Sequence, residues 1–162
     1  MAIEKVRAAL AEKGLADRIH EFDQSSATVS LAAEAVGCDP AQIVKTLSFH
    51  AGDRVVLVAC AGDARIDNRK FKDFFGAKGK MLSAGEAETL IGHAVGGVCP
   101  FAVNPGVEVF LDESIRRFAM VYPAAGSSNS AAYLTPDELA QCAAPCQWAD
   151  VCKLPEPEAA GE

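Results

Sequence analysis

The sequence predicts a single α+β domain in which a mixed β-sheet, partly closed toward a barrel, is surrounded by short α-helices. Its 162 residues suffice for one domain with a proper core, and half of them are hydrophobic. Strand-like and helix-like segments are mixed without the strict rhythm of βαβ units, which favours the α+β class. We expect the domain to span residues 1–153. Residues 154–162 have no apolar face and are expected to form a disordered tail.

Helices are predicted where a capping side chain precedes a short periodic apolar stretch. Ile3, Val6 and Leu10 share one face of the first such segment. Asp39, followed by a proline and then by Gln42, has the spacing of a capping box and starts a helix that can only be short. The predicted helices cover residues 3–13, 29–36, a short stretch after 39, 67–76, 83–92 and 135–143, with Thr28, Asp67, Ser83 and Thr135 as further N-caps.

Strands are predicted from alternating or continuous apolar runs that are bounded by turn residues. The two clearest runs, residues 46–50 and 54–62, are separated by an Ala-Gly-Asp turn and are expected to pair with each other. The remaining predicted strands cover residues 18–22, 80–82, 107–112, 117–126 and 131–134.

Composition argues against several classes of protein. No apolar run approaches the length that crosses a bilayer, and residues 1–14 mix charges with apolar positions, unlike a secretory signal. We therefore expect a cytoplasmic protein with six reduced cysteines. Cys142, Cys146 and Cys152 lie close together but form no CxxC pair, and no histidine is near them. Neither a metal site nor a cofactor is expected.

One segment is strongly basic although the chain as a whole carries a net charge of −7. Residues 65–80 hold six basic and two acidic side chains, with Phe71, Phe74 and Phe75 between them. An amphipathic helix whose lysines are solvated explains this pattern and, taken alone, is favoured. The alternative is a surface that contacts phosphate groups. Its candidate contacts are Arg65, Arg69, Lys70 and Lys72.

The chain lacks the motifs of α/β-hydrolases, P-loop proteins, zinc proteases and dinucleotide-binding folds. Two other features stand out. Lys45 lies among apolar residues at a predicted helix-to-strand junction, so either its ammonium has a function or its stem packs while its head reaches solvent. Gly96 and Gly97 precede Cys99 and Pro100. Backbone amides without side chains can polarise a ligand carbonyl there, although a plain turn explains the glycines equally well.

Cys99 is the obvious candidate nucleophile, and His93 is close to it in the sequence. A reactive cysteine needs a lowered pKa, which a histidine, a cation or a helix N-terminus can provide. Neighbours in a loop need not be partners in space. A small packing residue in a tight loop is therefore the favoured interpretation of Cys99.

Three stretches form a recognisable combination: VKTL at 44–47, GGVCPF at 96–101 and YPAAGSSNSAAYLTPDEL at 122–139. Their order and spacing resemble those of the YbaK/EbsC-like family, which are free-standing trans-editing aminoacyl-tRNA deacylases related to the editing domain of bacterial prolyl-tRNA synthetase. The resemblance covers about residues 3–153. It implies a mixed sheet curled toward a barrel with helices outside, in agreement with the pattern of elements.

The resemblance implies hydrolysis of the ester that joins a wrongly chosen amino acid to a tRNA, with tRNA-Pro as the expected carrier. Lys45 corresponds to the lysine that holds the phosphate of the terminal adenosine. Gly96 and Gly97 belong to the loop whose amides position the aminoacyl group, and water or a substrate group performs the attack. Because positioning and preformed dipoles supply much of the rate, no catalytic triad is needed. The expected substrate contacts are Thr28, Thr46, Val98, Cys99, Pro100, Ser128 and Asn129.

The resemblance implies the 3′ acceptor end of tRNA as the partner, with the four basic candidates named above as further contacts. Recruitment of prolyl-tRNA synthetase stays open, and neither DNA nor a membrane is expected. Some relatives have a serine where this chain has Cys99, an asparagine where it has Thr46, or a histidine in the SSNS stretch at 127–130. Since these differences fall where selectivity is set, alanine, serine, threonine, cysteine and 2-aminobutyrate all stay open as the amino acid removed.

Two other functions remain as alternatives. A non-catalytic module would keep Lys45 and the glycine loop to bind an aminoacyl or nucleotide ligand without hydrolysing it. A cysteine-dependent hydrolase or redox protein would instead centre on Cys99. Turnover of charged tRNA separates the first alternative from a deacylase, and replacement of Cys99 separates the second.

Overall fold

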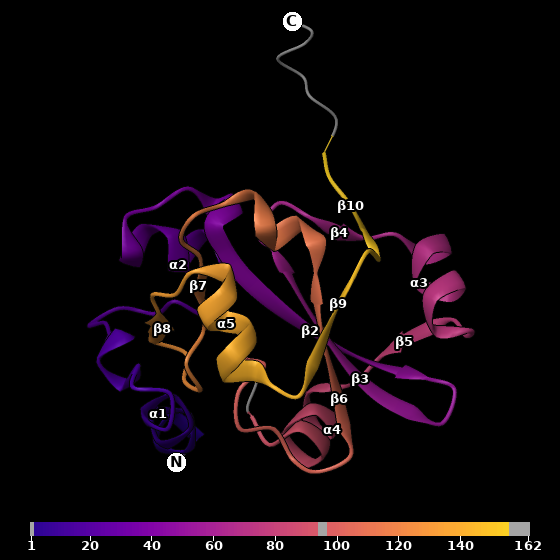
Figure 1. Ribbon diagram of the computed structural model, residues 1–162, viewed down its shortest axis with the longest axis horizontal. Helices are drawn as coiled ribbons and strands as arrows, with labels where there is room; N and C mark the ends of the chain where they lie inside the picture. Colours follow the sequence, from indigo (N-terminus) through magenta and orange to yellow (C-terminus); the bar gives the residue numbers. More distant parts are fainter. Residues whose placement is uncertain (1, 94–96, 156–162) are drawn as a thin grey trace, which may run out of the picture.

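A six-stranded mixed sheet forms the centre of the protein in the computed structural model, which describes residues 2–93 and 97–155. Strands β2 (Ile43–Ala51) and β3 (Arg54–Ala61) make an antiparallel hairpin in the middle of this sheet, as the sequence predicts (Figure 1). β2 starts three residues earlier than predicted. Lys45 therefore lies inside a strand and not at a helix-to-strand junction.

The other strands extend the hairpin on both sides. β6 (Val107–Asp112) pairs parallel with β3, and β9 (Cys146–Ala149) pairs parallel with β6. β5 (Gly79–Met81) and β7 (Tyr122–Pro123) both pair with the outer edge of β2, the former antiparallel and the latter parallel. The α+β class and the mixed sheet are thus confirmed. In the described part of the chain this sheet stays open and does not close into a barrel.

Two smaller strand pairs lie outside the main sheet. β1 (Ile19–Glu21) pairs with β8 (Ser130–Ala132), and β4 (Arg65–Ile66) pairs with β10 (Cys152–Lys153), both antiparallel. The second pair joins the end of the described chain to the segment that leads into the basic helix. The sequence analysis did not predict β9 and β10, because such short segments carry no clear period-two pattern.

Short helices and turns surround the sheet, and their N-caps form as predicted. Thr28 accepts a hydrogen bond from the backbone N–H of Leu31, and complete capping boxes begin at Asp39, Ser83 and Thr135. The helical segments are α1 (Ala2–Ala11), η1 (Ala16–Arg18), α2 (Val29–Val36), η2 (Pro40–Gln42), α3 (Asn68–Phe75), α4 (Ala84–Glu86), η3 (Ala87–Ile91), η4 (Glu113–Arg117) and α5 (Pro136–Ala143).

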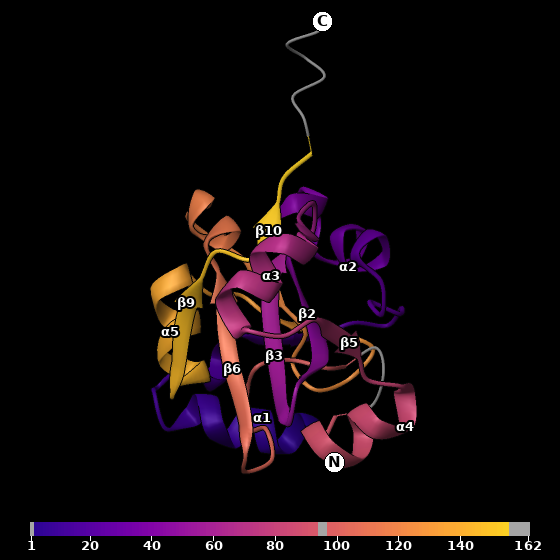
Figure 2. The ribbon, with the colours of Figure 1, turned by 90° about the vertical axis from the view of Figure 1, so that its right-hand side faces the viewer.

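The two faces of the sheet bury different sets of side chains. α1 and α5 cover one face, where Leu10 and Leu139 pack in one cluster with Leu57 of β3. α3 covers the other face with Phe71 and Phe75 (Figure 2). Burying a large apolar side chain contributes about 2 kcal/mol, so these residues fix the helices on the sheet. Two phenylalanines of the basic segment, Phe71 and Phe75, therefore pack inward, as an amphipathic helix requires, whereas Phe74 is exposed.

The predicted strand over residues 117–126 is mostly not a strand. The 3-10 turn η4 extends to Arg117, and only Tyr122 and Pro123 pair with β2. The Asp112 side chain accepts from the backbone N–H of Ser114 and so starts the turn. Local capping therefore outweighs the strand-like composition here. Of the predicted disordered tail, residues 156–162 lie outside the described residues.

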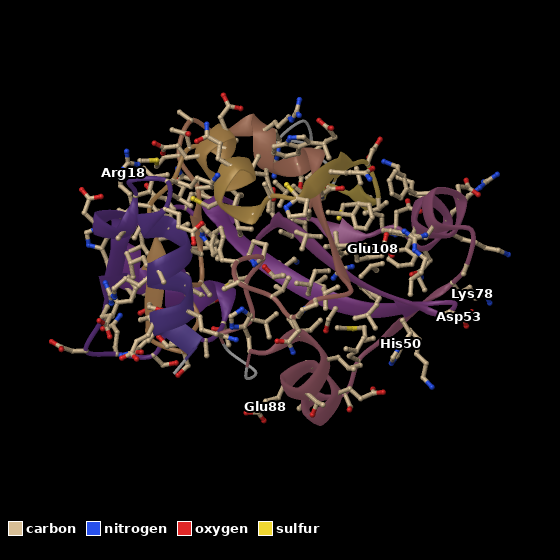
Figure 3. The ribbon with its side chains drawn as sticks, turned by 60° about the horizontal axis from the view of Figure 1, so that its bottom comes forward. Arg18, His50, Asp53, Lys78, Glu88 and Glu108 are labelled. Carbon is tan, nitrogen blue, oxygen red and sulfur yellow. The ribbon has the colours of Figure 1, made fainter. Side chains whose placement is uncertain are left out.

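Ion pairs tie the elements together at the surface. Arg18 pairs with Glu138 of α5 at 2.8 Å, and His50 at the end of β2 lies 3.0 Å from Glu86 of α4. Figure 3 shows His50 beside Asp53 and Lys78 near the turn of the β2–β3 hairpin, far from Arg18. Ion pairs that stay in contact with solvent stabilise a protein by at most about 1 kcal/mol each, so packing carries most of the stability.

Candidate functional site

The outer edge of β2 is interrupted, and the candidate site lies at this interruption. β7 pairs with Ile43 and Val44, and β5 pairs with Phe49 to Ala51. Between them, residues 45–48 have no strand partner on that edge among the described residues. A cavity of about 310 Å³ opens here. Its other walls come from the N-terminal turn of α2, the β5–α4 segment, Val98, Tyr122, Ala124 and β8.

The cavity reaches both faces of the sheet, because side chains alternate along a strand. Ile43 shares a face with Lys45 and packs with Val29 and Ala32 of α2. Thr46 points to the opposite face, since its cross-strand partner Ala59 belongs to the cluster beneath α1 and α5. A ligand at the bare edge of β2 would therefore meet Lys45 on one side and Thr46 on the other.

Lys45 is the sole charged side chain among the described residues that line the cavity. Its ammonium donates a hydrogen bond to the carbonyl oxygen of Gly62, 3.4 Å away, and the side chain is half-buried. An ammonium has three donors, so this contact leaves capacity for an anionic ligand. No Asp, Glu, His or Cys lines the described part of the cavity.

Gly62 has to be a glycine because the chain comes very close to it. A Cβ atom there would collide with the carbonyl oxygen of Pro40 and lie 2.9 Å from Cγ1 of Val29. Gly62 directly follows β3, and its carbonyl oxygen accepts the hydrogen bond of Lys45. The end of β3 therefore lies in close contact with η2 and α2. Gly62 was not predicted as a site residue, because the sequence shows it only as the end of an apolar strand.

Thr46 brings an unsatisfied hydroxyl to the site. Its Oγ1 is buried and has no hydrogen-bond partner among the described residues. The carbonyl of Ser48 faces β5, since it accepts from the N–H of Leu82 at 3.1 Å. In an antiparallel ladder, residues two apart direct their backbone groups to the same edge, so the N–H and C=O of Thr46 face the gap. Thr46 therefore offers a side-chain oxygen and a bare backbone amide at the same place.

The glycine loop reaches the cavity through Val98, which lines it. Gly96 lies outside the described residues. Gly97 is buried, and a Cβ atom on it would lie 2.8 Å from the backbone of Gly126 and Ser127. The close approach of the backbone of Gly126 and Ser127 therefore explains why residue 97 is a glycine.

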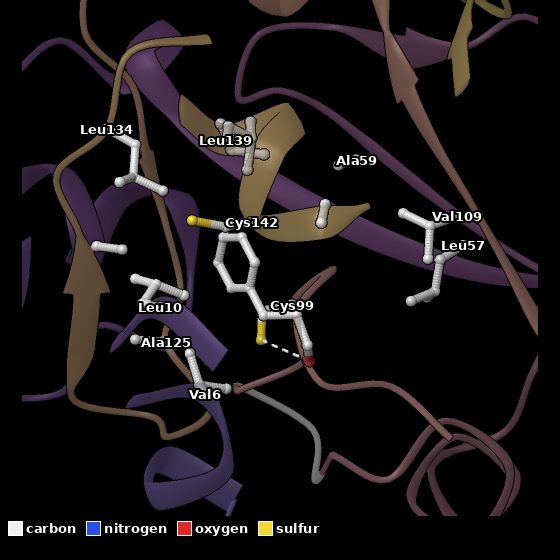
Figure 4. Packing of buried hydrophobic residues seen from close by; sticks show 14 of the residues in the cluster. Val6, Leu10, Leu57, Ala59, Cys99, Val109, Ala125, Leu134, Leu139 and Cys142 are labelled. Carbon is white, nitrogen blue, oxygen red and sulfur yellow. Dashed lines mark hydrogen bonds between the residues drawn. The ribbon is translucent and has the colours of Figure 1, made fainter. Parts of the chain in front are cut away.

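Cys99 does not line the cavity. Its side chain is fully buried in the core under α1, between the loop and residues such as Val6 and Ala125 (Figure 4). The sulfur lies 3.6 Å from Nε2 of His93 and 3.9 Å from the carbonyl oxygen of Phe101. Burial raises the pKa of Cys99 to about 12, so the thiol stays protonated at neutral pH. This geometry supports a packing role and gives no nucleophile.

His93 is no base for Cys99 either. Its Nε2 lies 2.7 Å from the carbonyl oxygen of Phe101, which requires that nitrogen to carry the proton. Burial lowers the pKa of His93, so the imidazole is neutral near pH 7. Pro100, another predicted contact, is also buried and away from the cavity wall.

Three other predicted contacts have structural partners. The hydroxyl of Thr28 faces the cavity but caps α2. Asn129 donates to the carbonyl of Phe22 and accepts from Ser127, and neither Asn129 nor the exposed Ser128 lines the cavity. The cavity side of this segment is formed by Ser130 instead, which the sequence analysis did not select.

The cavity includes further residues that the sequence did not reveal. Tyr122 lies where β7 meets β2, and burial raises the pKa of its phenol. Met81 lines the cavity with 59% of its surface exposed, and Ser26 and Ala87 complete the walls. Tyr122 begins one of the three recognised stretches, but Met81, Ser26 and Ala87 belong to none of them, and each residue reaches the site through pairing or packing over long sequence distances.

The four predicted phosphate contacts lie outside the cavity walls: Arg65, Arg69, Lys70 and Lys72. All are exposed. The β4 strand begins three residues after Gly62, so the basic segment leads away from the partner of Lys45. The ammonium of Lys70 is held by Asp150 and by the carbonyl of Cys152, each at 3.0 Å.

Within residues 2–93 and 97–155, no group of three or more His, Cys, Asp or Glu side chains is placed to hold a metal ion. The six cysteines form no disulfide bond. Among the described helices, none has the length and apolar character that spanning a membrane requires.

The protein thus has an open mixed sheet with a lysine-lined cavity at its interrupted edge, and its fold is that of the trans-editing domains. The fold matches a crystal structure described as that of a candidate trans-editing enzyme for prolyl tRNA synthetase, with a TM-score of 0.85 and 30% identity over 94% of this chain and 97% of that one. The chain belongs to the aminoacyl-tRNA editing domain family, which matches residues 23–142. The resemblance seen in the three sequence stretches is confirmed.

Two curated proteins are also similar to the chain in sequence. The uncharacterized protein YwhH of Bacillus subtilis (strain 168) is 46% identical over 154 residues, which cover 94% of this chain and 98% of YwhH. The proline–tRNA ligase of the same strain is 29% identical over 119 residues, which cover 73% of this chain but 20% of the ligase. The chain therefore corresponds to one part of the much longer ligase and to nearly all of YwhH.

Proposed function

We propose that the protein hydrolyses, in trans, the ester of mischarged aminoacyl-tRNA, with tRNA-Pro carrying a small non-cognate amino acid as substrate. The observation that supports this most directly is the cavity itself. It combines one cation with largely apolar walls at a bare strand edge, and its described lining holds no cysteine and no Asp, Glu or His that could activate a hydroxyl for nucleophilic attack. Such a site suits an ester that is already activated and needs to be positioned for attack by water.

The two sides of the cavity fit the two ends of such an ester. In this proposal the ammonium of Lys45 holds a phosphate of the tRNA 3′ end, and the small amino acid lies on the side walled by Ala87, Val98 and Ala124. The backbone N–H of Thr46, together with amides of the glycine loop, would then face the ester carbonyl. Donors that are fixed by the fold stabilise the negative charge that develops on this oxygen. This activity would take place in the cytoplasm, where tRNA is charged.

A deacylation assay tests the proposal. tRNA-Pro that is charged with alanine, serine or 2-aminobutyrate should lose this amino acid faster with the protein than in buffer. The same tRNA charged with proline should be protected, because a small pocket excludes a larger side chain by steric clash. If the protein bound these charged tRNAs without accelerating hydrolysis of any of them, the deacylase proposal would be refuted in favour of a binding module.

We also propose that Arg65 and Arg69 contact the tRNA backbone, because both are exposed on the segment that follows Gly62. Replacing both by glutamate should weaken tRNA binding and flatten its dependence on salt concentration, by roughly one unit of slope per lost phosphate contact. Filter binding at several salt concentrations measures this.

The matched control is the double variant Lys13→Glu and Lys78→Glu, which changes the net charge equally at exposed positions that are not among the four candidate contacts. It should bind nearly as the unaltered protein does. Equal weakening by both double variants would mean that only net charge matters, and the specific contact would be disproved.

A further inference from the structure

We propose that the site selects amino acids with a small hydroxylated side chain, such as serine, and that the hydroxyl of Thr46 is the group that recognises them. This preference deepens the deacylase function proposed above and rests on it. Thr46 lines the cavity beside mostly apolar side chains, and its hydroxyl oxygen is buried without a partner, so the chemistry of that atom limits what can bind beside it.

The Thr46 hydroxyl is unusual among the polar atoms of the structure. Within the described residues, only two buried side-chain N or O atoms have no hydrogen-bond partner, Oγ1 of Thr46 and Nδ1 of His93. His93 does not line the cavity, whereas Thr46 does. A buried polar group without a partner is costly, so it favours a ligand that can satisfy it.

Four other hydroxyls in the cavity wall are already engaged, whereas those of Ser48 and Tyr122, which also line it, are not among the buried atoms that lack a partner. Thr28 and Ser83 cap helices, and the hydroxyl of Ser26 is 3.4 Å from the carbonyls of Ser128 and Ser130. The hydroxyl of Ser130 receives a hydrogen bond from that of Ser127 at 2.7 Å. Bonds within the fold hold these groups, so a ligand gains less from them than from the buried oxygen of Thr46.

The surroundings of Thr46 favour a neutral group of small size. The side chains that line this side of the cavity include Leu82, Ala87, Val98 and Ala124, and no carboxylate lines its described part. A desolvated ammonium without a counter-charge would be strongly unfavourable here, whereas a hydroxyl can both donate to and accept from Thr46. The partner of Oγ1 is therefore a side-chain hydroxyl and not the α-ammonium of the amino acid.

Serine and 2-aminobutyrate separate hydroxyl recognition from size, since they differ by a hydroxyl in place of a methyl group. An apolar pocket distinguishes such a pair poorly, but a pocket with a buried hydrogen-bonding group prefers the hydroxyl. We expect seryl-tRNA-Pro to be deacylated at least about 10-fold faster than 2-aminobutyryl-tRNA-Pro, as one additional hydrogen bond in a buried site implies.

Two substitutions test the role of Thr46. Thr46→Val keeps the shape and removes the hydroxyl, so the ratio of the seryl to the 2-aminobutyryl rate should fall to about one. Thr46→Ser keeps the hydroxyl and should retain most of the preference, which shows that the valine result is not a folding defect. The measured quantity is the ratio of the two single-turnover rates, and thermal unfolding confirms that both variants are folded.

The possible failures can be told apart. If no charged tRNA is deacylated at all, the deacylase proposal falls and the preference with it. If the unaltered protein removes 2-aminobutyrate as fast as serine, the preference alone is overturned. If Thr46→Val slows both substrates equally and leaves the ratio unchanged, Thr46 does not recognise the substrate's side chain. Thr46 would then contact a portion of the substrate that all charged tRNAs share.

Discussion

Replacing Lys45 by alanine should reduce deacylation of mischarged tRNA-Pro by at least about 100-fold, because it removes the sole cation that lines the described part of the cavity. The loss should reflect function and not folding. Lys45 is half-buried and makes one hydrogen bond, to the carbonyl of Gly62, so its removal should cost about 1 kcal/mol of stability. Single-turnover hydrolysis and thermal unfolding, measured on the same preparation, separate the two effects.

Two further lysine variants sharpen this experiment. Lys78→Ala removes an exposed lysine near the turn of the β2–β3 hairpin and should leave the rate unchanged (Figure 3). Lys45→Arg keeps the charge but changes its shape and reach, so it should recover part of the activity. If Lys45→Ala hydrolysed the ester nearly as fast as the unaltered protein, the assignment of the lysine to the substrate phosphate would be wrong.

Replacing Gly62 by alanine should destabilise the protein by about 3 kcal/mol and reduce activity as well. The added methyl group would collide with the backbone carbonyl of Pro40, and a backbone atom cannot move aside as a flexible side chain can. η2 and β3 would have to separate, which displaces the carbonyl that holds Lys45. Chemical denaturation measures the stability, and the deacylation rate is compared at a temperature where both proteins are folded.

Gly85 provides the matched control for this substitution. It lies in α4, and a Cβ atom there would meet nothing within 4 Å. Gly85→Ala should therefore leave stability unchanged or raise it by about 0.5–1 kcal/mol, as alanine does at an open helical position. Equal stability of Gly62→Ala and the unaltered protein would show that β3 and η2 can separate freely and that Lys45 is not held in this way.

The sequence alone located most helix starts, because an N-cap is a local interaction. The boxes at Asp39, Ser83 and Thr135 join residues three apart, and all three form as predicted. The central hairpin was predictable for the same reason, since a short turn joins its two apolar strands. The sequence likewise singled out Lys45 as a candidate site residue and, through three stretches considered together, indicated the family.

The shape of the site was decided by the tertiary structure alone. The gap in the edge of β2 exists because Tyr122 and Pro123 pair with one end of the strand while β5 pairs with the other. Both pairings join segments about 30 to 80 residues apart in sequence, and no local pattern encodes where they stop. The parallel pairing of β6 with β9 also joins segments that are distant in sequence, and of these two strands the sequence predicted only β6.

Individual residues follow the same division between local and long-range interactions. Cys99 stands in a conspicuous motif, yet packing buries its side chain and leaves it without a part in the site. Gly62 stands in unremarkable sequence and gains its importance from a distant segment that approaches it, and the burial of the Thr46 hydroxyl is likewise seen only in the folded chain. Hydrogen bonds over a few residues are encoded locally, whereas burial and close backbone contact arise only when the whole chain has closed on itself, and for that reason only the tertiary structure shows which of these residues form the site.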